Sequence, residues 1–124
     1  MSHLRFFSLI LLVNPCHAEQ RIYSNVRYIE EGAGDLVGTE LELTLVNDKV
    51  EGKLRIYQGA CAASIPVNGI TNHGHLRLVG SDSTYGKIEV SGTADEQSFQ
   101  GILTLEKGIA NKKLRLHRTS KPHC

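Results

Sequence analysis

The sequence predicts an all-β domain folded as a closed antiparallel up-and-down barrel of eight strands. Three observations predict this fold. Apolar residues recur at every second position through most of the chain after residue 20. Short segments rich in Asn, Asp and Gly separate the alternating runs. No stretch of ten residues repeats its apolar positions with the period of a helix.

Each alternating run sends aliphatic side chains to one face of a strand and polar side chains to the other. In the first clear run, Leu41, Leu43 and Leu45 share one face. One buried face and one wet face are typical of antiparallel sheets. The runs that show the pattern best are 39–46, 50–57, 75–80, 86–92, 98–106 and 112–118. Two less regular runs, 21–30 and 64–71, complete the eight expected strands.

Closing the sheet would remove exposed strand edges, which otherwise promote aggregation. Glycines inside the expected strands suit the bends of a tightly curved sheet; they are Gly52, Gly69, Gly92 and Gly101. The inward-facing residues are mostly Leu, Ile and Val. A sandwich of two sheets made from the same strands is the alternative architecture.

The first eighteen residues have the layout of a secretory signal peptide. Arg5 is followed by the apolar run 6–13 and then by a short segment that ends in the small residue Ala18. We therefore expect residues 1–18 to be a signal peptide and 19–124 to form one β-barrel domain, periplasmic or secreted. The apolar run is too short to span a bilayer. A lipid anchor at Cys16 is disfavoured, because the preceding residues are not the usual small ones.

The charge pattern argues against nucleic acid and anionic membranes as partners. Without Arg5, 13 Lys and Arg balance 13 Asp and Glu. The basic residues are spread singly along the strands and form no stripe of the kind that phosphate backbones require.

Two cysteines remain in the expected domain, Cys61 and the C-terminal Cys124. Two cysteines in an exported domain predict a disulfide. In the chain-entropy model, such a bridge across about 60 residues contributes roughly 4 kcal/mol.

The stretch "YIEEGAGDLVGTELEL" gathers carboxylates around a glycine-rich loop, and it has two interpretations. In the first, Glu31, Asp35 and Glu40 are solvated residues at the rim of a hairpin, with Lys53 or Arg55 pairing with the strand carboxylates. In the second, they meet at one mouth of the barrel and bind a cation or a basic partner. Nothing in the sequence marks the cleft that paired catalytic carboxyls need.

The segment 58–66 is the most promising binding loop, because it is long, rich in small residues and tethered if Cys61 is bridged. A loop held in place binds at little ordering cost. Tyr57, Gln58 and Ile65 flank the loop as possible anchors. The alternative is a plain connection across the barrel end.

Other chemistry has little support in the sequence. His73, His75 and His123 follow no recognised metal-ligand spacing, so we expect exposed histidines and no metal site. No serine lies in a nucleophile elbow, and no glycine loop is placed to cradle phosphate. We expect no cofactor.

The rhythm of the G-x-L-x-L and G-x-I-x-V strands and the closing "LRLHR" resembles the avidins and lipocalins, the calycin-like barrels. Residues 23–43 are also similar to a class of small exported bacterial proteins. The resemblance implies a small exported barrel. The chain has no Trp, so neither the aromatic cage of a biotin site nor the Gly-x-Trp opening of lipocalins is present.

These observations favour a non-enzymatic exported binding module, of the inhibitor or immunity type, that contacts another protein through loops at one barrel end. The first alternative is a carrier that holds one small apolar ligand among Leu41, Leu43, Leu54 and Leu103. The second is an enzyme that uses the loop carboxylates. A monomer or a small homo-oligomer fits each of these.

Overall fold

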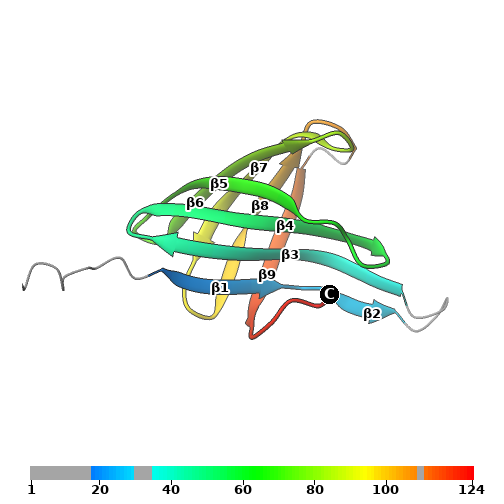
Figure 1. Ribbon diagram of the computed structural model, residues 1–124, viewed down its shortest axis with the longest axis horizontal. Coiled ribbons are helices and arrows are strands. Elements are labelled where there is room, and N and C mark those ends of the chain that lie inside the picture. Colours follow the sequence, from blue (N-terminus) through cyan, green and yellow to red (C-terminus); the bar gives the residue numbers. More distant parts are fainter. Residues whose placement is uncertain (1–17, 30–34, 109–110) are drawn as a thin grey trace, which may run out of the picture.

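The computed structural model describes residues 18–29, 35–108 and 111–124, which form a single antiparallel sheet (Figure 1). In this part of the chain there is no helix long and apolar enough to cross a membrane. The strands are β1 (Glu19–Ser24), β2 (Arg27–Ile29), β3 (Asp35–Val46), β4 (Lys49–Gly59), β5 (Ile65–Asn72), β6 (His75–Asp82), β7 (Gly86–Ala94), β8 (Ser98–Leu105) and β9 (Asn111–Thr119).

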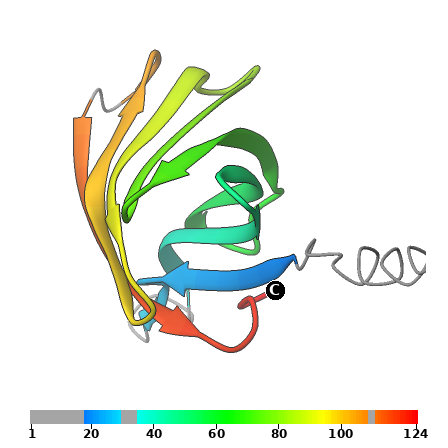
Figure 2. The same ribbon diagram turned by 90° about the vertical axis from the view of Figure 1, so that its left-hand side faces the viewer.

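The sheet closes on itself, because β1 pairs with β3 on one side and with β9 on the other. Eight strands, β1 and β3 to β9, therefore form the barrel, and β2 is an extra strand beside β3. Figure 2 shows the curvature of the sheet. The predicted up-and-down barrel is confirmed, and the two-sheet sandwich is wrong because the ring of strand pairs is continuous. The closing seam is short, with β1 and β9 paired only at Ile22↔Thr119, Tyr23↔Arg118 and Ser24↔His117.

The run 21–30, expected as one strand, is divided after Ser24. The backbone N–H of Asn25 donates to Thr39 O (3.1 Å), but the N–H of Thr39 donates to the side-chain oxygen of Asn25 (2.7 Å). The chain then leaves β9 and continues as β2 along β3 only. Gly38 makes this possible: its φ is +133°, and a Cβ there would lie 2.7 Å from the Asn25 side-chain oxygen. A side chain at position 38 would push the two strands apart.

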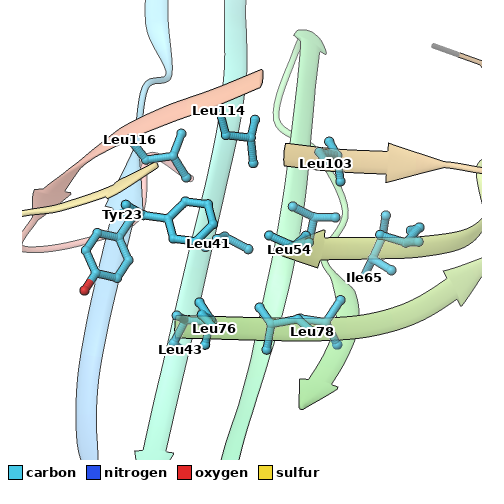
Figure 3. Packing of buried hydrophobic residues seen from close by; sticks show 14 of the residues in the cluster. Tyr23, Leu41, Leu43, Leu54, Ile65, Leu76, Leu78, Leu103, Leu114 and Leu116 are labelled. Atoms are coloured by element: carbon cyan, nitrogen blue, oxygen red, sulfur yellow. The ribbon is translucent and has the colours of Figure 1, made fainter. Parts of the chain in front are cut away.

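The predicted alternation fixes which side chains fill the barrel. Leu41 pairs with Leu54 across β3 and β4, and both are fully buried. Tyr23 and Phe99 add a tilted aromatic pair with ring centroids 6.4 Å apart. Figure 3 shows Tyr23, Leu41 and Leu54 among the side chains that converge from several strands. The buried cluster consists of Tyr23, Leu41, Leu43, Val50, Leu54, Ile65, Val67, Leu76, Leu78, Ile88, Val90, Phe99, Leu103, Leu105, Leu114 and Leu116.

The hairpin turns gather at the two ends of the barrel. At one end, which we call the turn end, the backbone N–H of Thr71 bonds to Asp48 O (2.9 Å), and that of Ala94 bonds to Gly74 O (2.8 Å). These bonds join the β3–β4, β5–β6 and β7–β8 turns. The antiparallel order places the β4–β5 and β6–β7 connections at the other end, which we call the loop end.

Candidate functional site

The C-terminal residues 120–124, which we call the strap, return from the end of β9 towards β3 (Figures 1 and 2). A disulfide joins Cys124 to Cys61 in the β4–β5 loop, with the two Cα atoms 5.8 Å apart. The predicted bridge is therefore present. It ties together two segments that are 63 residues apart in sequence.

Beneath the strap lies a patch of the outer barrel wall. The register places Glu40 opposite Arg55 on β4 and opposite Ser24 on β1. All three side chains alternate with core residues, so they point away from the barrel interior. Glu40 is nevertheless 0% exposed, and the outward-facing Tyr57 is only 2% exposed. The first interpretation, in which Glu40 is a solvated rim residue, is wrong, because the strap covers Glu40.

The Glu40 carboxylate is satisfied mainly by His123 of the strap. The ring nitrogen Nδ1 of His123 lies 2.6 Å from Oε1 of Glu40, and its backbone N–H donates to Oε2 at 3.2 Å. The hydroxyl of Tyr57 makes a longer contact with Oε2, at 3.4 Å. A buried charge needs such partners, since an unpaired one is strongly disfavoured. The buried carboxylate and the disulfide thus hold the strap at two neighbouring residues.

Arg55 lies at the edge of this cluster and pairs chiefly with Glu42. Its guanidinium is 2.9 Å from a Glu42 carboxylate oxygen and 3.9 Å from Glu40. The predicted pairing of Arg55 with the β3 carboxylates is confirmed. Burial raises the pKa of Tyr57 above its ordinary value, and the negative charge of Glu40 adds to the effect. The phenol is therefore protonated at neutral pH and donates to the carboxylate.

Ser24, His123 and Glu40 are the residue types of a hydrolytic triad, but their arrangement differs from one. The Ser24 hydroxyl lies 3.5 Å from Nδ1 of His123, the same nitrogen that contacts Glu40. In a triad the serine and the carboxylate contact opposite nitrogens of the imidazole ring. Ser24 also accepts a hydrogen bond from the backbone N–H of Val26 (3.1 Å). The geometry is that of a structural clasp.

The structure brings some of the predicted site residues together. Asp35 begins β3, and its neighbour Leu36 pairs with Gly59 at the end of β4, so Asp35 and the exposed Gln58 lie close to the tethered loop. Ile65 lies instead in the core, with 6% of its side chain exposed. Ile65 and Tyr57 therefore support the loop from below and do not present surface anchors. Glu31 lies outside the described residues.

Sequence reasoning missed the role of His123. The residue is exposed overall, as expected, but its ring is 34% exposed and lies against Glu40. The sequence did contain a signal for this contact. His123 adjoins Cys124, so a disulfide between Cys124 and Cys61 brings both residues to the end of β4. Among the described residues, no three His, Cys, Asp or Glu side chains gather closely enough to hold a metal ion.

A depression of about 330 Å³ lies at the turn end. Leu43, Leu45, Leu76 and Asp95 are among the residues that line it. The hydroxyl of Tyr23 donates to the backbone oxygen of Asp95 (2.6 Å).

The chain was compared with models of protein families, with curated proteins and with solved structures, and none of them matches it. The chemistry of these two places therefore has to be argued from their residues.

Proposed function

We propose that this chain is a non-enzymatic, exported binding module that contacts another protein through the loop end of its barrel. Its contact surface is the tethered loop 60–64, together with Asp35 and Gln58. The observation that carries the proposal is the double anchorage of this loop: Cys61 is bonded to Cys124, and the adjacent His123 is clasped by the buried Glu40.

A loop fixed in this way suits an inhibitor or an immunity protein. Such proteins bind tightly when little conformational freedom is lost on association. The exposed residues Ala60, Ala63 and Ser64 are small, so the loop backbone can approach a partner closely and enter a narrow cleft. Asp35 and Gln58 beside it are exposed and can bond to the rim of that cleft.

The same features support the exported location. Disulfides persist in oxidising compartments such as the periplasm and the extracellular space. The N-terminal segment 1–18, which has the pattern of a signal peptide, supplies the route. Both observations favour a partner outside the cytoplasm.

The test is capture of a stoichiometric partner from the exported protein fraction by the tagged chain. We expect Ala63→Arg in the tethered loop to weaken the complex by about tenfold or more, because the larger side chain blocks close approach. Gln97→Arg, an exposed substitution at the turn end, is the matched control and should bind like the natural chain. Equal binding by both variants, or a monomer with no partner, would contradict the proposal.

A carrier of one small apolar ligand is the second candidate. The depression at the turn end supports it, because three leucines line part of it, beside Arg21, Asp95 and Glu96, and its volume of about 330 Å³ suits a small molecule. The dense cluster of Leu41, Leu54 and Leu103 argues for the first candidate, since these side chains are at most 1% exposed. Titration with a fluorescent apolar probe separates the two functions.

A further inference from the structure

The chain contains the tripeptide Lys-Leu-Arg twice, once in β4 (53–55) and once in β9 (113–115). The two copies present the same faces. Leu54 and Leu114 are both buried in the core, with 0% and 3% of their side chains exposed. The basic residues on either side of each leucine point outwards. The two strands thus offer a neighbour the same pattern of cation, aliphatic group and cation.

In β4 this pattern has a partner strand. Its complement is Glu40-Leu41-Glu42 of β3, with Arg55 opposite Glu40, Leu54 opposite Leu41 and Lys53 opposite Glu42. The Arg55 guanidinium lies 2.9 Å from a Glu42 oxygen. Opposite charges on facing strands stabilise pairing, and the leucines pack together on the inner face. The fold itself therefore shows which strand complements Lys-Leu-Arg.

In β9 the second copy lies on an edge to which no described strand pairs. β8 pairs with β9 from Asn111 to His117, whereas β1 pairs with it only from His117 to Thr119. The backbone N–H of Arg118 donates to Gln97 O (2.8 Å), so even-numbered residues bond on the β8 side. Lys113 and Arg115 consequently direct their backbone N–H and C=O groups to the opposite edge. A guest strand can bond to these groups.

The outer face next to this edge favours an acidic guest. A depression of about 680 Å³ is lined by Thr93, Gln100, Gly101, Ile102, Lys113, Leu114 and Arg115, with no carboxylate in its lining. The exposed Ile102 lies on the β8 side of Lys113, away from the unpaired edge, so it is the charge of Lys113 and Arg115 that favours an acidic guest. The charge of this surface is therefore positive, although the expected domain as a whole has equal numbers of acidic and basic residues.

We infer that the free edge of β9 accepts an extended segment of another protein in which Glu or Asp alternates with aliphatic residues. The guest pairs antiparallel to residues 111–116, with its carboxylates beside Lys113 and Arg115. A second copy of the chain is a poor guest. Its own Glu-Leu-Glu is paired on both sides, and two β9 edges would bring cations face to face. This site is distinct from the tethered loop and does not depend on it.

The probe is a synthetic, dye-labelled octapeptide with the sequence of residues 38–45, Gly-Thr-Glu-Leu-Glu-Leu-Thr-Leu. Its binding to the full chain is followed by fluorescence anisotropy at physiological salt. We expect saturable binding to the natural chain. Lys113→Glu with Arg115→Glu should weaken it by about tenfold or more, since two attractions become repulsions. A peptide with lysines in place of its glutamates should bind this variant and restore the affinity.

Two controls make the result decisive. Lys49→Glu with Lys87→Glu makes the same charge change on exposed residues of β4 and β7 and should leave binding unchanged. Methylating the peptide nitrogens of one alternate set of residues should abolish binding, while methylating the other set should not, because a guest strand bonds through one set only. Equal loss in both charge variants, or equal tolerance of both methylation patterns, would overturn the inference. A concentration-dependent dimer abolished by the β9 substitutions would overturn it in favour of self-association.

Discussion

Glu40 lies on the outer wall of the barrel yet has no contact with water, because five C-terminal residues cross over it. Its carboxylate accepts from the ring and the backbone of His123 and contacts the Tyr57 hydroxyl. Glu42 carries the same charge on the same outer face of β3, but its side chain is 30% exposed and pairs with Arg55. The two glutamates share a strand face and a charge but differ in burial and in their partners.

We predict that Glu40→Gln lowers the free energy of unfolding by about 1–3 kcal/mol, because His123 and Tyr57 lose a charged acceptor at a buried site. Glu42→Gln is the control and should cost less than about 1 kcal/mol, as expected for a half-exposed ion pair. Urea denaturation of both variants measures the difference. Equal costs would mean that the strap does not shield Glu40 in solution.

At the scale of elements, the strap and the β4–β5 loop form one unit through the Cys61–Cys124 bond. Neither segment has regular secondary structure to hold it. Their order comes from the disulfide and from the clasp between His123 and Glu40. The kink after Ser24 has an equally local origin, in the Asn25 side chain and the space left by Gly38.

We predict that replacing both cysteines by serine lowers the free energy of unfolding by about 4 kcal/mol, the chain-entropy value for a closed loop of this length. The freed strap should also expose Tyr57, which near-ultraviolet difference absorbance detects as a tyrosine newly accessible to solvent. Reductant should reproduce both changes in the natural chain and have no effect on the serine variant. A stable serine variant with Tyr57 still buried would show that the clasp alone holds the strap.

The whole barrel is stabilised by side chains that every strand of the ring sends inwards, Tyr23 from β1 and mainly aliphatic ones from the other strands. Gly92 and Gly101 face each other across β7 and β8, and a Cβ on Gly101 would lie 2.7 Å from the Phe99 ring. Their missing side chains let Phe99 lie across the strands and fill the core.

We predict that Leu54→Ala costs about 2–5 kcal/mol, the range for a leucine removed from a packed interior. Val79→Ala on the outer face, where Val79 is 40% exposed, should change stability by about 0.5 kcal/mol or less. Chemical denaturation of the two variants compares them directly. A small cost for Leu54→Ala would indicate a loosely filled interior and favour the carrier function.

Much of this fold could be predicted from the sequence, because alternation is a local property. The faces of Leu41, Leu43 and Leu45 follow from a strand's two-residue period, whatever the strand pairs with. The turns at Asn47 and His73 follow from residues that tolerate a positive φ, here 60° and 52°. The candidate site was harder to predict. Asp35 and Gln58 are placed by neighbouring strands, but His123 reaches Glu40 only after the chain has closed.

The β-barrel and its aliphatic interior could be predicted from the sequence alone, because side-chain alternation and turn residues act between near neighbours along the chain. Two features could not: which outward residue is buried, and which strand edge has no described strand paired with it. Both depend on where distant segments come to lie: the strap on Glu40, and β2 against β3 instead of β9. In the sequence, a glutamate that faces water and a glutamate that the strap covers look alike. They differ only once the strap has folded over one of them.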